Sequence, residues 1–311
     1  MKDFFAFLIA AALTIPVAQA QPQPSCATPG ADNAFLGVQT IRLWTGTPPQ
    51  AKGTSCDDIP ALTIFDPQPG TANGSAVVIF PGGAYMHLAS NLEGRQIADW
   101  FAARGFRAFV LSYRLASHGY LFPVPLLDAR RAIQTVRARA LDYHVDPHRI
   151  VVIGFSAGGN LAALSGTQFV PGDSNSDDPI ERVSSRPDYM VLGYPWIGAL
   201  SGDTTHLSYC KLFNVMDRCE ELSKAYSADL SVSKETPPTF IYHTFTDQTV
   251  PVEQSLRFYD ALVKAGVPSE MHIFAKGAHG TGLGKGDAAL GQWPGLLETW
   301  LRGQGVLKSS F

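Results

Sequence analysis

The stretch IVVIGFSAGGN, residues 150–160, constrains the fold more than any other part of the chain. Residues 150–153 are apolar and β-branched and stop at a glycine, which is typical of a strand buried on both faces of a parallel sheet. Residues 161–164 then continue as a helix. Ser156 therefore lies on a sharp strand-to-helix turn, where glycines on either side remove Cβ atoms that would clash. This G-x-S-x-G pattern predicts a nucleophilic serine presented at the end of a sheet, with a helix N-terminus behind it.

The same pattern has a simpler interpretation. The chain contains 29 glycines, so a glycine-rich turn whose serine only caps the following helix fits the stretch as well. The choice depends on whether a base, an acid and oxyanion donors occur where this fold needs them.

The rest of the chain alternates apolar runs with helical patterns, as in βαβ units. The expected strands are residues 39–44, 62–65, 76–80, 107–112, 150–153, 189–193, 239–244 and 270–274. The expected helices are residues 93–104, 126–143, 157–166, 252–265 and 288–302. Residues 167–187 and 196–238 break the alternation, and we expect them to be loops that frame the site. The sequence therefore predicts an α/β fold, with a mostly parallel central sheet, helices on both faces and small insertions in place of a large lid.

The first residues have the features of a secretory signal peptide. Lys2 precedes an apolar stretch over residues 4–17, and Ala18-Gln19-Ala20 is a small-residue cleavage site. A membrane anchor is the alternative, but the stretch is shorter than the roughly 20 residues that a span needs. We expect residues 1–20 to be the signal peptide, 21–35 a polar leader and 36–311 a single catalytic domain. The protein would then be secreted or periplasmic.

Charge and cysteines limit the partners. The net charge is −3, which gives no reason to expect a nucleic-acid partner, and no later stretch is suited to cross a membrane.

Export makes disulfides plausible, and we favour Cys26–Cys56 and Cys210–Cys219 because each pair is local; four reduced thiols are the alternative. No pair has the C-x-x-C spacing of a zinc or redox site, and we expect neither a metal nor another cofactor.

A serine hydroxyl needs a base to take its proton and an acid to orient that base. Asp247 follows the expected strand that ends near residue 244, and His279 follows the one that ends near residue 274. Because carboxyl ends of parallel strands meet at one edge of a sheet, we expect both side chains beside Ser156. Alone, Asp247 could be a turn residue and His279 an exposed loop histidine.

Other acids and histidines are weaker candidates. Asp217 and Asp229 belong to the 196–238 insertion and follow no convincing strand. His243 lies inside an expected strand, where a core histidine that supports the site is more common than a base.

Attack by the serine creates an oxyanion, which backbone N–H groups must stabilise. Ala157, at the start of its helix, offers one donor. Gly83 and Ala84, in the Pro81-Gly82-Gly83-Ala84 stretch after the 76–80 strand, offer others. A glycine turn that only ends a strand is the alternative.

Several stretches together resemble a known family: FPGGAY, the Glu93-Gly94 pair, SYRLA, LLDARRAI, VDPHRIVVIGFSAGGNLAA and AKGAHGTGL. They resemble secreted bacterial α/β-hydrolases of the acetylxylan and feruloyl esterase type, and the likeness runs from about residue 76 to residue 301. The resemblance implies an α/β-hydrolase fold and a triad of Ser156, Asp247 and His279. It also implies hydrolysis of acetyl esters on plant polysaccharide. Pro81 stands where lipases and esterases carry the histidine of H-G-G-G, which leaves the anchoring of this loop open.

We therefore expect a serine carboxylesterase acting on an acylated carbohydrate such as xylan, or on another small ester. Tyr85 and Trp196, near the expected mouth of the site, are candidates for stacking on sugar rings. A short-chain lipid or aryl esterase and a non-catalytic ligand-binding member of the fold are the alternatives. No facing pair of carboxylates suggests a glycoside hydrolase. The acyl length, the alcohol half of the ester and the oligomeric state are left open.

Overall fold

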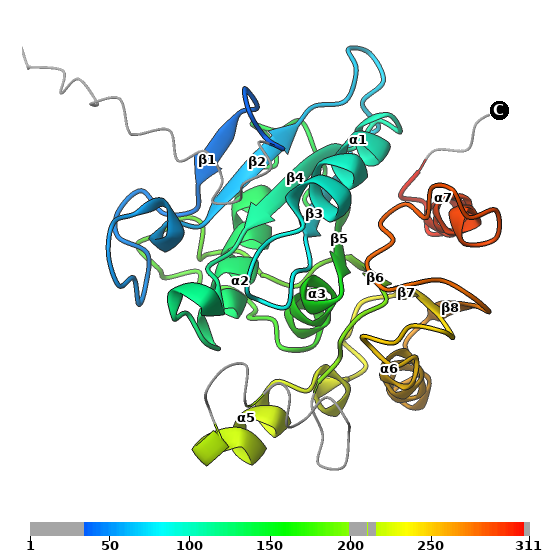
Figure 1. Cartoon of the computed structure of the whole chain (residues 1–311). Coiled ribbons are helices and arrows are strands. Elements are labelled where there is room, and N and C mark those ends of the chain that lie inside the picture. The colour runs from blue at the N-terminus through cyan, green and yellow to red at the C-terminus, as the bar shows by residue number, and fades with distance from the viewer. Residues whose placement is uncertain (1–33, 199–209, 211–215, 308–311) are drawn as a thin grey trace, which may run out of the picture.

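In the computed structural model, the described residues are 34–198, 210 and 216–307, and eight strands among them form one sheet (Figure 1). The strands are β1 Thr40–Arg42, β2 Ala61–Phe65, β3 Ala76–Phe80, β4 Arg107–Ser112, β5 Ile150–Phe155, β6 Tyr189–Gly193, β7 Thr239–Thr244 and β8 Ser269–Phe274. Their order across the sheet is β1-β2-β4-β3-β5-β6-β7-β8. The β1–β2 and β2–β4 pairs are antiparallel, and all the others are parallel.

Helices cover both faces of this sheet. The helices in the described residues are α1 Gln96–Ala102, α2 Val124–Ala138, α3 Ala157–Thr167, α5 Cys219–Ala225, α6 Glu253–Lys264 and α7 Trp293–Gly303. Helices α2, α3 and α6 pack on one face, and α1 and α7 pack on the other. The predicted α/β fold with a mostly parallel sheet is confirmed.

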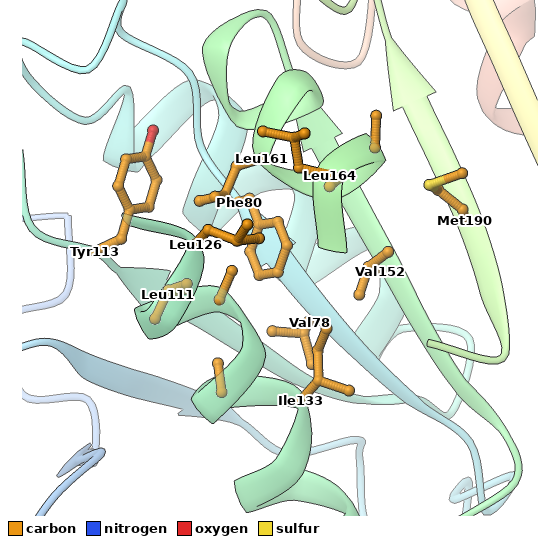
Figure 2. Packing of buried hydrophobic residues seen from close by; sticks show 14 of the residues in the cluster. Val78, Phe80, Leu111, Tyr113, Leu126, Ile133, Val152, Leu161, Leu164 and Met190 are labelled. Carbon is orange, nitrogen blue, oxygen red and sulfur yellow. The ribbon is translucent and has the colours of Figure 1, made fainter. Parts of the chain in front are cut away.

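The core follows the two-residue period of the strands. In β3, Val78 and Phe80 face α2 and α3, as Figure 2 shows, whereas Val77 and Ile79 face α1 and α7. All four side chains are fully buried. At about 1.5–3 kcal/mol for each buried aliphatic or aromatic side chain, these two layers hold the central strands, and so their carboxyl ends, in fixed positions.

Three of the expected helices differ from the structure, and the one expected over 288–302 begins later, as α7 at Trp293. The helix expected over 93–104 is divided into a wider π-type turn, Ser90–Arg95, and α1. The helix expected over 126–143 is α2, which begins at Val124 because Pro125 suits the first turn of a helix. Helix α5 lies in the 196–238 segment that the sequence predicts as a loop.

The cysteines agree with the prediction where the structure describes them. Cys210 and Cys219 form a disulfide with a Cα–Cα distance of 5.4 Å. Cys56 is also disulfide-bonded. Its predicted partner, Cys26, lies outside the described residues, as do the predicted signal peptide (residues 1–20) and most of the predicted leader. Across the described ranges, no helix combines the length and apolar character needed to span a membrane.

Candidate active site

Ser156 occupies a strained turn between β5 and α3. Its φ is 54° and its ψ is −119°, in a region that costs a non-glycine residue about 1–3 kcal/mol. Neighbouring glycines permit the turn: a Cβ on Gly154 would lie 2.1 Å from the Gly158 carbonyl oxygen, and one on Gly158 would lie 2.0 Å from that of Phe80. The Ser156 N–H donates to the carbonyl of Gly193 at 3.1 Å. The backbone therefore holds the serine in a conformation that directs its hydroxyl away from the end of β5.

The three side chains that the sequence predicts as a triad lie in one hydrogen-bonded series. The Nε2 of His279 is 2.8 Å from the Oγ of Ser156, and its Nδ1 is 2.7 Å from Oδ2 of Asp247. The residues follow the carboxyl ends of β5, β7 and β8, so the parallel sheet brings them together from distant parts of the chain. This arrangement has the geometry that nucleophile activation by a general base requires.

Asp247 is buried and surrounded by donors. Its Oδ1 accepts the N–H groups of Thr249 and Val250, both at 2.9 Å, and its Oδ2 faces His279 and, at 3.4 Å, the Nε2 of His243. Burial opposes ionisation, but the hydrogen bonds outweigh it and hold the pKa of Asp247 well below its usual range. The carboxylate is therefore ionised at neutral pH and can keep a proton on Nδ1 of His279, which leaves Nε2 free to accept.

The weaker candidates lie elsewhere. His243 is fully buried behind Asp247, with Nδ1 2.7 Å from the Ser255 hydroxyl, which confirms it as a core residue that supports the acid. Asp229 pairs with the guanidinium of Arg257 at 2.8 Å. Asp217 is exposed. Within the described residues, no group of three His, Cys, Asp or Glu side chains is arranged to hold a metal ion.

Residues 81–84, here called the oxyanion loop, lie directly beside the serine. A Cβ on Gly82 would lie 3.0 Å from the Cβ of Ser156. Gly83 and Ala84 have φ values of 125° and 55°. No hydrogen bond between described residues occupies the N–H groups of Gly83, Ala84 or Ala157, the three predicted oxyanion donors.

Two buried side chains anchor this loop without the histidine that Pro81 replaces. The hydroxyl of Tyr113 donates to the carbonyl of Pro81 at 2.7 Å. The N–H of Gly82 donates to Oε2 of Glu93 at 2.8 Å. The sequence predicts no such role for Glu93, because a single glutamate before a glycine carries no sign that it will be buried against a loop ten residues earlier.

The two predicted substrate contacts differ in exposure. Tyr85 is only 2% exposed, its hydroxyl donates to Oδ1 of Asn160 at 2.7 Å, and its ring packs edge-on against Phe122. Its predicted stacking on sugar is therefore wrong, because packing closes off the ring. Trp196 is partly exposed, and its backbone N–H donates to the carbonyl of Ser156 at 3.1 Å. Contact of Trp196 with sugar stays a prediction.

A hollow of about 540 Å³ opens beside the histidine, and most of its exposed lining is apolar. Hydroxyl, amide and backbone groups line it: Thr246, Gln248, Thr249, Gly277, Ala278 and His279. The hydroxyl and amide groups of Thr246, Gln248 and Thr249 can form hydrogen bonds to a ligand there.

Family comparisons divide the chain into two matched parts. Residues 62–187 match the family model described as BD-FAE, and residues 198–303 match that of the prolyl oligopeptidase family. The first segment includes Ser156, and the second includes Asp247 and His279.

Curated relatives are longer than this chain. It is 34% identical over 206 residues to endo-1,4-beta-xylanase B of Butyrivibrio fibrisolvens, a match over 66% of this chain and 32% of that protein. It is 32% identical over 220 residues to an acetylxylan esterase of Xylanibacter ruminicola, over 70% of this chain and 43% of that protein. The match thus spans less than half the length of either relative.

A solved structure matches over nearly its full length. The acetyl ester-xyloside bifunctional hydrolase of Caldicellulosiruptor lactoaceticus is 40% identical, with a TM-score of 0.79. The match covers 86% of this chain and 97% of that one.

Proposed function

The chain belongs to the α/β-hydrolases of the acetylxylan and feruloyl esterase type, and on this premise we propose that it is a serine esterase that removes acetyl groups from xylan. The observation that carries the proposal is the hydrogen-bonded series from Ser156 through His279 to Asp247. A base oriented by a buried carboxylate and in contact with a serine hydroxyl suits acyl transfer.

The first half of the reaction forms an acyl-enzyme. His279 takes the proton of Ser156 as Oγ attacks the ester carbonyl, and Asp247 stabilises the imidazolium that results. The N–H groups of Gly83, Ala84 and Ala157 stabilise the negative charge on the carbonyl oxygen. His279 then gives its proton to the departing alcohol, and the acetyl group remains on Oγ.

The second half releases the acid. Water gives a proton to His279 and attacks the acyl carbonyl, and the same N–H groups stabilise the second oxyanion. Collapse of this intermediate returns the proton to Oγ of Ser156 and frees acetate.

Two features support a sugar as the alcohol half of the ester. The relatives named above act, by their names, on acetylated xylan or on xylosides. The hollow beside His279, the residue that must protonate the leaving alcohol, includes the hydroxyl and amide groups of Thr246, Gln248 and Thr249 in a lining that is otherwise mostly apolar, a mixture that suits a sugar ring.

Export suits a polymeric substrate outside the cytoplasm. We propose that residues 1–20 are removed and that residues 36–311 act as one catalytic domain in the periplasm or outside the cell. A mature protein whose N-terminus is Gln21 would support this, and an intact N-terminus on exported protein would contradict it.

The test compares wild type, Ser156→Ala and the control Ser174→Ala, which changes an exposed serine. Acetate release is measured from acetylated xylan and butyrate release from tributyrin, with p-nitrophenyl acetate as a general ester. We expect release from acetylated xylan by wild type and Ser174→Ala, and loss of all activity in Ser156→Ala. Turnover of tributyrin without acetylated xylan would favour a lipid esterase, and wild-type turnover by Ser156→Ala would refute the proposed nucleophile.

A further inference from the structure

Glu93 is a buried carboxylate that the mechanism above does not use. It lies in the Ser90–Arg95 turn that precedes α1 and is 3% exposed. Among the described residues it makes no ion pair with lysine or arginine, and both of its oxygens accept hydrogen bonds from neutral groups. A carboxylate is costly to bury in this way, so its presence needs a reason.

One oxygen fixes the oxyanion loop. Oε2 accepts the N–H of Gly82 at 2.8 Å, while the carbonyl of Gly82 accepts the N–H of Ala89 at 3.0 Å. Both backbone polar groups of Gly82, the residue before Gly83, are thus tied to the Ser90–Arg95 turn or to Ala89 at its N-cap. A Cβ on Gly82 would lie 2.6 Å from Oε2 of Glu93 and 3.0 Å from Cβ of Ser156. Gly82 therefore lies between the carboxylate and the nucleophile, next to both.

The other oxygen of Glu93 binds Tyr194, which in turn packs against His279. Oε1 accepts the hydroxyl of Tyr194 at 2.7 Å, and that hydroxyl accepts the N–H of Gly282 at 3.0 Å. The ring of Tyr194 packs edge-on against the imidazole of His279, with ring centroids 5.0 Å apart. Tyr194 thereby holds both the ring of His279 and the segment three residues after it.

We propose that Glu93 is a positioning residue that couples the oxyanion loop to the catalytic histidine, through Gly82 on one side and Tyr194 on the other. This inference rests on the proposed function. The oxyanion donors of residues 83 and 84 follow β3, in the middle of the sheet, and His279 follows β8, at its edge. Glu93 would fix the position of these two groups relative to each other.

The electrostatics agree with this role. Burial raises the pKa of Glu93 above its usual value, and the hydrogen bonds from Tyr194 and Gly82 oppose that rise. The Gly82 N–H can only donate, so it favours the ionised carboxylate at that oxygen.

The test uses Glu93→Ala, Glu93→Gln and the exposed-residue control Glu253→Ala, with kcat and KM measured on p-nitrophenyl acetate and thermal unfolding measured for each. A misplacement near 1 Å can cost about 100-fold, so we expect Glu93→Ala to lower kcat about 100-fold and to change KM less than about threefold. The amide oxygen of Glu93→Gln can still accept from Gly82, and its NH₂ can face the hydroxyl of Tyr194. This variant should keep kcat within about tenfold of wild type, because geometry is preserved.

A second variant covers a failure of Glu93→Ala to fold. Tyr194→Phe keeps the ring against His279 and removes only the hydroxyl, and we expect kcat to fall about tenfold at unchanged KM, as for one lost hydrogen bond. Wild-type kcat in folded Glu93→Ala or in Tyr194→Phe would overturn the coupling, as would an equal loss in Glu93→Gln and Glu93→Ala. Ser156→Ala in the same assay tests the proposed function itself. Loss of activity in Ser156→Ala together with wild-type kcat in folded Glu93→Ala would overturn the coupling and leave the proposed function standing.

Discussion

Replacing Asp247 by asparagine tests whether this residue sets the position of the imidazole proton of His279. In the structure, Oδ1 of Asp247 accepts two backbone N–H groups, those of Thr249 and Val250. An asparagine must therefore place its carboxamide oxygen at that position and turn its NH₂ toward His279. The NH₂ then donates to Nδ1 of His279, and the imidazole proton moves to Nε2. Because Nε2 lies 2.8 Å from Oγ of Ser156, the histidine can no longer accept the serine proton.

The expected loss follows from the wrong tautomer. The same change in a serine protease triad lowers kcat about 10⁴-fold, which corresponds to about 5 kcal/mol of transition-state stabilisation. The side chain keeps its shape and its two backbone hydrogen bonds, so the fold and the ester-binding surface should be preserved. We therefore expect kcat on p-nitrophenyl acetate to fall by about this factor while KM changes little.

The assay measures initial rates over a range of substrate concentrations for wild type, Asp247→Asn and the control Asp217→Asn, which alters an exposed carboxylate. Asp217→Asn should match wild type. A kcat of Asp247→Asn within about tenfold of wild type would refute the reasoning, since the base would then act without an acid to set its tautomer.

Three further predictions concern stability. Because the pKa of Asp247 is lowered in the folded state, its carboxylate stabilises the fold above about pH 4, and this stabilisation is lost as the pH falls. The difference in urea-unfolding free energy between wild type and Asp247→Asn should therefore shrink below that pH. A difference that grows in acid would contradict this. Asp128 and Arg114 form an ion pair whose side chains are 0% and 1% exposed, so Asp128→Ala should lower the unfolding free energy by about 3–5 kcal/mol. Asp66 is exposed in its pair with Arg107, and Asp66→Ala should lower it by less than about 1 kcal/mol. Equal losses in the two variants would refute this. Replacing Cys210 and Cys219, which are nine positions apart, by serine opens the loop between them and should lower the unfolding free energy by about 3 kcal/mol. An unchanged urea midpoint would count against that value.

The strands are predictable from the sequence because the physical signal is local. The inner strands are buried on both faces and are therefore mostly apolar, as Ala76–Phe80 is along its whole length. The order of neighbours in the sheet is not local: nothing in those apolar runs states that β4 lies between β2 and β3. The division of the expected 93–104 helix is not local either: a Cβ on Gly94, in the Ser90–Arg95 turn, would lie 3.2 Å from both Phe35 and Val110, which are distant in the sequence.

The candidate triad is predictable for a different reason. Ser156, Asp247 and His279 each follow a strand, and a parallel sheet gathers such positions at one edge. The exposure of Tyr85 is not predictable in this way. Gly83, Ala84 and Tyr85 all have positive φ, a conformation that no residue pattern reveals, and the ring of Tyr85 is buried as a result.

The most direct test of the central claim is to trap the acyl group. Wild-type protein is mixed rapidly with p-nitrophenyl acetate, quenched in acid and digested, and the peptides are analysed by mass spectrometry. We expect acetylation of Ser156 that appears with the first turnover and then decays as acetate is released. Full turnover with no acetyl group on Ser156, or with the group on another residue, would contradict the mechanism.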